Sequence, residues 1–205
     1  MTLLLGGSDL SAQAPMILDG LHDSSLEAIN RDRLRLTRQG MTVLGAWAVG
    51  NMAVGGYFWA RRTGTVQAFH QMNVLWNTVN LGLAAVGYWN AREAAAEGLD
   101  ALATLQEYHS LEKLLLFNAG LDVGYMAFGL YLQERGRRME RNQFRGWGRS
   151  LVLQGAFLFL FDTGLTWMVS RQKTEHLLTT NPSMSLGLTP TWSGAPPLAS
   201  MKLRF

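Results

Sequence analysis

Cysteine is absent from this chain of 205 residues, and charge is missing from long stretches of it. The lack of cysteine excludes disulfide bonds, thiolate metal sites and cysteine nucleophiles. The sequence also has no glycine-rich phosphate loop before a helix, no HExxH pair and no persuasive Ser-His-Asp order. We therefore predict that the protein is not an enzyme.

The charge that is present is unevenly distributed. Four windows of about twenty residues carry almost no charge, and nearly all of the 18 Lys and Arg residues lie between them. A membrane-spanning helix needs roughly 20 mostly apolar residues, whereas helices of a soluble bundle show a charged stripe. The mean hydropathy of +0.03 hides this segregation because it averages spans with connections. The pattern predicts an all-α, four-helix transmembrane bundle in contact with the lipid bilayer.

The membrane domain is predicted over residues 24–175, with spans at 40–60, 69–90, 114–132 and 151–169. Residues 24–38 alternate apolar and charged side chains, which is typical of an amphipathic helix at the interface or of an extension of the first span. The connection 91–112 has leucines at helical spacing, so we expect a second amphipathic helix on the membrane surface. Basic residues flank spans instead of forming an aromatic patch, so no nucleic acid is expected as a partner.

The two ends of the chain lie outside this domain. Residues 1–23 contain Ala12-Gln13-Ala14, which has the form of a signal-peptidase site, but no basic segment precedes it and the apolar run covers only Leu3 to Leu5. We interpret this segment as a degenerate signal peptide. Residues 176–205, rich in Pro, Ser, Gly and Thr from Thr179 onward, are predicted to form a flexible tail that wanders or docks on a partner.

Charge also bears on orientation. Four spans place both termini on one side, and the connections 61–68 and 133–149 on the other. The latter pair contains eight basic residues with two acids, whereas ten basic residues on the termini side are mixed with eleven acids. Because Lys and Arg concentrate in short cytoplasmic loops, we predict that both termini are non-cytoplasmic.

Two acids inside predicted spans are the main candidate site. Asp122 lies eight residues from the start of the third span, and Asp162 lies seven from the end of the antiparallel fourth. At 1.5 Å per residue, both lie roughly 10 to 12 Å below the same surface and could face each other. Asn51 and Asn80 reach a similar depth, so the four side chains are predicted to form one polar layer.

This cluster has two interpretations, which remain open here. Asp122 and Asp162 could bind and release a proton or Na⁺ during transport, with the asparagines as neutral ligands. Alternatively, the acids hydrogen-bond across helices and fix their packing. The same choice applies to Asn73, Asn77 and Asn80, which share one stripe of the second span. That stripe either lines a polar path or forms an interhelical hydrogen-bond ladder.

The four histidines give no haem or metal site. His22, His70, His109 and His176 all lie outside or near the ends of spans, so no pair matches in depth and no ligand set converges. We predict no cofactor. Gly120 and Gly124 form a GxxxG pattern, which close packing between helices explains.

The segment His70-Gln71-Met72-Asn73-x-Leu75-Trp76-Asn77-x-x-Asn80, with Gln39-Gly40-Met41 and Gly55-Gly56, resembles a family of small bacterial membrane proteins classed as a domain of unknown function. The resemblance covers residues 25–175 and implies a four-helix membrane topology and the bacterial inner membrane. No activity comes with it. We therefore predict a non-catalytic subunit or scaffold of a membrane complex, with protein partners or a homo-oligomer. The alternative is a small proton- or cation-coupled transporter or channel component that uses Asp122 and Asp162.

Overall fold

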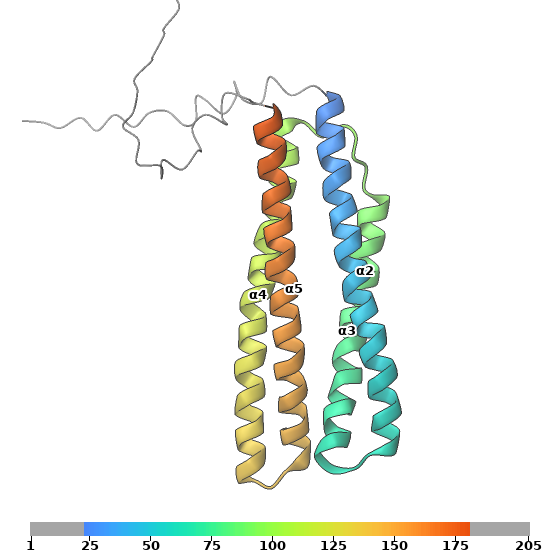
Figure 1. Cartoon of the computed structure of the whole chain (residues 1–205), viewed down its shortest axis with the longest axis vertical. Helices are drawn as coiled ribbons and strands as arrows, with labels where there is room; N and C mark the ends of the chain where they lie inside the picture. The colour runs from blue at the N-terminus through green and yellow to red at the C-terminus, as the bar shows by residue number, and fades with distance from the viewer. Residues whose placement is uncertain (1–22, 181–205) are drawn as a thin grey trace, which may run out of the picture.

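The computed structural model describes residues 23–180, which form four long helices and no strand within that range. They are α2 (Asp23–Arg61), α3 (Gly64–Glu93), α4 (Ala101–Arg138) and α5 (Asn142–Thr180). Successive helices run antiparallel, so α2 and α3 form one hairpin and α4 and α5 a second (Figure 1). The predicted all-α architecture of four helices is therefore confirmed.

Tight turns close both hairpins at the same end. Gly64 begins α3 with φ of +65°, a left-handed conformation that favours glycine, and Glu140 in the second turn has φ of 54°. The link between the hairpins, residues 94–100, lies at the opposite end (Figure 1). It ends at Asp100, whose carboxylate caps α4 by accepting a hydrogen bond of 2.7 Å from the backbone N–H of Ala103.

The two hairpins meet mainly where α3 packs against α5. Glycines bring the backbones close together. A Cβ on Gly146 of α5 would collide with the backbone of Thr65 and Phe69 on α3. A Cβ on Gly129 of α4 would lie 2.7 Å from the carbonyl oxygen of Gly148 on α5. These contacts explain several glycines as packing residues.

The predicted GxxxG contact is different. A Cβ on Gly120 or Gly124 would have nothing within 4 Å, so neither glycine lies at a contact between described helices. The α4–α5 contact instead uses a pair of glycines seven residues apart on each helix: Gly129 and Gly136 on α4, Gly148 and Gly155 on α5. The spacing alone could not distinguish an inward face from an outward one.

For residues 24–38 the structure agrees with the alternative that they extend the first span, since they are the first turns of α2. The separate helix predicted over residues 91–112 is wrong, because residues 101–112 are the first turns of α4. These two segments bind each other instead of lying on a surface. Asn30 donates a 2.8 Å hydrogen bond to Thr104, and Arg33 pairs with Glu107 at 3.1 Å.

The apolar stripe of this region is also buried. Ile29 and Leu36 pack with Tyr108 and Leu115 in one cluster with Leu165 and Val169. The flexible tail was predicted to begin at residue 176, but residues 176–180 are the last residues of α5, which ends at Thr180. Residues 1–22 and 181–205, including the signal-peptide site and the rest of the tail, lie outside the described residues.

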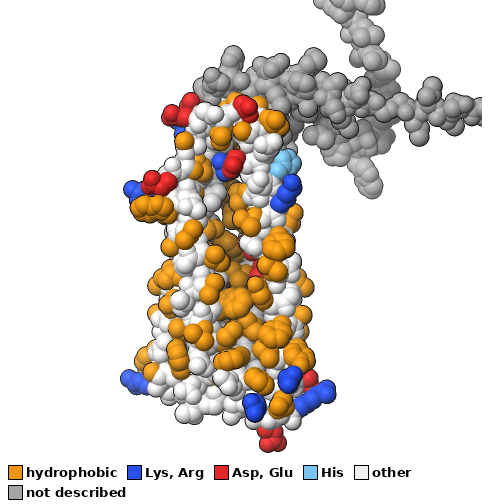
Figure 2. Space-filling model, turned by 180° about the vertical axis from the view of Figure 1, so that it is seen from behind, with side chains coloured by type: hydrophobic (Ala, Val, Ile, Leu, Met, Phe, Trp, Pro, Cys, Tyr) orange, Lys and Arg blue, Asp and Glu red, His pale blue; other side chains and the backbone are white. Residues whose placement is uncertain are grey.

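The outer surface of the helices is apolar in their middle portions. Large hydrophobic side chains such as Val79, Leu83, Phe117, Leu160 and Trp167 are more than half exposed. One face of the molecule shows charged side chains gathered toward its two ends (Figure 2). Within the described residues, α4 over Ala101–Arg138 and α5 over Asn142–His176 are long and apolar enough to cross a membrane, by length and composition.

Candidate functional site

Asp122 and Asp162 lie side by side between α4 and α5. Their carboxyl groups are close enough to hydrogen-bond with each other. Asp122 is 2% exposed and Asp162 is 5% exposed. The depth argument from the sequence therefore placed these two residues correctly relative to each other. Oδ2 of Asp122 is buried and has no hydrogen-bond partner among the described residues.

A second polar group lies nearer the turns and joins three helices. Oδ1 of Asn73 on α3 accepts hydrogen bonds from Ser150 at 2.7 Å and from Gln154 at 2.9 Å, both on α5. From α2, Trp47 donates a 3.0 Å hydrogen bond to Gln154, and Asn51 accepts a 3.4 Å bond from Asn73. We call these five residues the Asn73 network.

The asparagines of α3 connect the network with the acid pair. Asn77 is fully buried and donates a 2.8 Å hydrogen bond to the carbonyl of Asn73, and Asn80 donates to Asn77 at 3.5 Å. Because α3 and α5 run in the same direction and Asn73 is level with Gln154, two further turns bring Asn80 to about the level of Asp162. The buried stripe predicted on the second span is present.

The buried polar side chains therefore form a column along the bundle instead of the single layer that the sequence predicted. Asn51 accepts its interhelical hydrogen bond from Asn73, so it belongs to the Asn73 network and not to the acid pair. Depth counted along a helix does not give the direction in which a side chain points, so it did not predict this partner. Asn51 and Asn77 thus lie nearer the turns, and Asn80, Asp122 and Asp162 lie together farther from them.

Apolar side chains cover the acid pair on its other side. Leu115, Leu165 and Val169 are each at most 5% exposed and belong to one cluster, against which Phe161 packs. Leu165 and Val169 are about one and two turns beyond Asp162 along α5. We call these four residues the apolar layer. The carboxyl pair thus has amides toward the turns and hydrocarbon toward the termini.

Beyond the apolar layer, charged pairs stabilise the end of the bundle near the termini. Glu112 accepts hydrogen bonds from Lys173 at 2.7 and 2.8 Å and from Ser170 at 2.6 Å. Burial alone would raise the pKa of Glu112, but these hydrogen bonds and the positive charge of Lys173 hold its pKa below the ordinary value.

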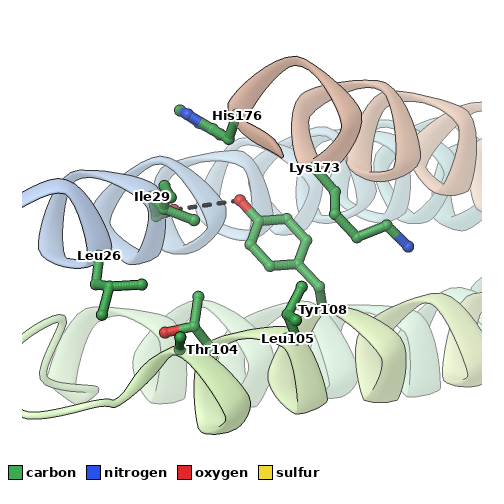
Figure 3. Close-up of a pocket in the computed structure, with 8 residues that line it drawn as sticks. Leu26, Ile29, Thr104, Leu105, Tyr108, Lys173 and His176 are labelled. Atoms are coloured by element: carbon green, nitrogen blue, oxygen red, sulfur yellow. Dashed lines mark hydrogen bonds between the residues drawn. The ribbon is translucent and has the colours of Figure 1, made fainter. Parts of the chain in front are cut away.

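A small cavity of about 20 Å³ lies near this end, between α2, α4 and α5 (Figure 3). It is lined by residues that include Leu26, Thr104 and Lys173. The ring of Tyr108 points across it and its hydroxyl donates a 3.2 Å hydrogen bond to the carbonyl of Ile29 (Figure 3). Burial raises the pKa of Tyr108 to about 12. The volume is sufficient for about one water molecule.

The histidines are apart from one another. His70 stacks on Phe58 with ring centroids 4.9 Å apart, His109 lies 3.7 Å from Glu112, and His176 lies 3.5 Å from Asp32. His22 is outside the described residues. No group of three or more His, Cys, Asp or Glu side chains within residues 23–180 is arranged to hold a metal ion.

Sequence reasoning missed Trp47, Ser150 and Gln154 as members of the polar core. A signal was present for two of them, since Ser150 and Gln154 are four residues apart and therefore share one face of α5. Trp47 gave no such signal, because a tryptophan in an apolar helix is equally typical of an interface anchor.

Residues 43–163 match a family of unknown function, DUF6992, and the chain belongs to that family. The predicted membership of an uncharacterised family is thereby confirmed, although Gln39-Gly40-Met41 lies just outside the matched range. No curated protein and no solved structure matches the chain.

Proposed function

We propose that the chain is an integral membrane protein that crosses the bilayer with α2, α3, α4 and α5. The observation that supports this proposal is the reversed arrangement of polarity. Asn73, Asn77, Gln154, Asp122 and Asp162 are buried between helices, whereas large apolar side chains face outward. In water this arrangement is unfavourable, because exposed apolar surface is not removed from solvent. In lipid it satisfies polar groups internally.

In this proposal the protein is a multi-pass component of the bacterial inner membrane. Arg61 ends α2 and Arg62 lies in the first turn, and Arg137, Arg138 and Arg141 lie around the second. Concentrated basic residues favour the cytoplasmic side. The two turns are therefore assigned to the cytoplasm, and the link 94–100 and both termini to the opposite side.

The proposed role is that of a non-catalytic subunit or scaffold of a membrane complex. The polar interior is largely occupied by hydrogen bonds between helices, as expected of packing contacts in a bilayer. Meanwhile, Gly120 and Gly124 leave small residues on the outward surface of α4, where another helix can approach closely. In this proposal, the other subunits of the complex contact outward surfaces such as that of α4 at Gly120 and Gly124.

Single-cysteine labelling tests the topology, because the chain has no background cysteine. In intact cells and inverted vesicles, Thr63→Cys should react with an impermeant maleimide from the cytoplasmic side only, and Ala96→Cys from the opposite side only. Val79→Cys is the matched control, since Val79 is 62% exposed in the isolated chain. Lipid should protect it until detergent is added. Reaction of all three without detergent would contradict the membrane assignment.

A second candidate function is favoured by the unpartnered Oδ2 of Asp122. Polar groups used only for packing are normally satisfied, and unsatisfied buried atoms need an explanation. We propose as the alternative that Asp122 and Asp162 carry a proton or cation in a small coupled transporter or channel component. Asp122→Asn and Asp162→Asn separate the two roles. A scaffold should retain its partners and its phenotype, whereas a carrier should lose activity while still folding.

A further inference from the structure

We infer that Asp122 and Asp162 together hold one shared proton, which exchanges with water from the end of the bundle that carries the two tight turns. This inference rests on the proposed membrane function and deepens its second candidate by naming the ion and its route. It depends on three features: the paired carboxyls, the amide column toward the turns, and the apolar layer toward the termini.

A proton is the cation that fits the paired carboxyls. Two adjacent buried carboxylates repel each other, and one proton between them removes that repulsion. No ion pair joins Asp122 or Asp162 to a base within the described residues. Ca²⁺ and Mg²⁺ bind about six or more oxygen ligands, and within the described residues no third His, Cys, Asp or Glu side chain converges on the pair. When the shared proton leaves to a water molecule, the charge of the pair changes from −1 to −2.

Most titratable groups of α3, α4 and α5 lie more than two turns from Asn80, Asp122 or Asp162 on the same helix; the nearest of them are His70 and Tyr88, Glu112 and Lys113, and Arg149 and Arg171. Two groups of the described residues are closer. Arg38 on α2 is two residues from Gly40, which faces Phe161 and Leu165 of α5, so Arg38 lies about one turn from the level of Asp162. Tyr125 is one turn from Asp122, and its ring packs edge-on against Trp76. Neither group forms an ion pair with Asp122 or Asp162, so the proton is assigned to the two carboxyls.

The route follows from the contrast between the two sides of the pair. Water enters buried sites that offer polar partners, whereas apolar interior sites stay dry. Toward the turns, buried amides continue from Asn80 through Asn77 to Asn73. Nε1 of Trp76 and Nδ1 of His70 are also buried without partners on this side. Toward the termini, the apolar layer offers water no hydrogen bond.

Infrared spectroscopy of the purified, reconstituted protein tests the site. The double variant Asp122→Asn/Asp162→Asn should lose one protonated-carboxyl band that the wild type shows, and this band should titrate as a single proton. Transfer to D₂O should shift the band at a measurable rate. A band that is absent from the wild type, or that survives in the double variant, would overturn the shared proton.

The route is tested by the exchange rate of that band. Asn77→Leu should slow the shift at least tenfold, while Val79→Leu, on the outward face of the same helix, should leave it unchanged. Adding Leu165→Asn to Asn77→Leu should restore fast exchange by opening the apolar layer. An unchanged rate in Asn77→Leu would overturn the proposed route.

Folding and the membrane assignment are controlled separately. Circular dichroism and gel filtration report whether Asn77→Leu is folded, and Asn80→Ala, which removes an amide without adding volume, replaces it if it is not. Slower exchange in Asn80→Ala supports the route and an unchanged rate overturns it. Failure of the membrane proposal appears in the labelling of Val79→Cys, whereas failure of this inference leaves that labelling pattern intact.

Discussion

Asn73 on α3 and Gln154 on α5 are joined by a 2.9 Å hydrogen bond inside the main contact between the two hairpins. Both side chains are almost fully buried, and Oδ1 of Asn73 also accepts from Ser150. A single amide therefore holds two donors of the opposite hairpin. This contact fixes the height of one hairpin against the other, because a shift by one turn would leave all three groups unsatisfied.

Replacing Asn73 by Ala should destabilise the protein by about 1–3 kcal/mol, because two buried donors lose their acceptor. A double-mutant cycle with Gln154→Ala should give a coupling energy of about 0.5–3 kcal/mol. Unfolding in mixed detergent micelles measures both. Strict additivity of the two substitutions would show that the hydrogen bond does not contribute.

The glycines of α4 and α5 give a matched comparison. In Gly148→Ala the new methyl would collide with the backbone of Gly129 and lie 2.7 Å from the backbone N of Gln133, so the helices must separate. We expect a loss of about 1–3 kcal/mol, as for other overpacked sites. Gly124→Ala meets nothing within 4 Å and should be neutral or stabilising by about 0.5–1 kcal/mol.

Thermal unfolding of these two variants side by side provides the measurement. A large loss in Gly124→Ala in cells, but not in purified monomeric protein, would identify the outward face of α4 as a contact with another chain. Equal stability of Gly148→Ala and wild type would contradict the close approach of α4 and α5.

The ion pair between Glu112 and Lys173 predicts a pH dependence. Since the folded protein holds the pKa of Glu112 below its ordinary value of about 4.3, the pair contributes stability above that value. The contribution is lost as pH falls through the lower folded pKa. Glu112→Gln should therefore lower the melting temperature at pH 7, and the difference from wild type should shrink in acid.

Glu134→Gln is the control for this experiment. Glu134 pairs with Arg137 and Arg138, but its side chain is 49% exposed, and such surface pairs contribute little. Its melting temperature should follow the wild type at every pH. A constant gap between Glu112→Gln and wild type down to strongly acid pH would show that Glu112 acts through packing instead of charge.

The number of helices and the pairing of Asp122 with Asp162 followed from the sequence, because uncharged windows and equal depths in antiparallel helices are both readable from spacing. The lengths of the helices did not follow. An amphipathic stripe such as residues 24–38 has the same pattern whether its apolar face meets lipid or a second helix. The hydrogen bond that shows a helix and not lipid beside this stripe joins Asn30 to Thr104, and these two residues lie far apart in the chain.

The sequence also did not show whether a small residue faces the inside or the outside of the bundle. Gly124 and Gly129 look alike in sequence. A Cβ on Gly124 would contact nothing within 4 Å, whereas a Cβ on Gly129 would collide with the backbone of α5. The helix period predicts which residues share a face, and the partner of that face depends on how the hairpins associate. The Asn73 network was hidden for the same reason, since its members come from three helices.

The link 94–100 has a further consequence, because it joins two hairpins that each close through their own tight turn. The covalent connection is then dispensable for recognition between the halves. If residues 1–98 and 99–205 are produced together as separate polypeptides, they should assemble into a complementing pair that copurifies through an affinity tag on one fragment. The coding sequence could then be divided at the link between the two hairpins, and the two fragments would form a heterodimer of helical hairpins.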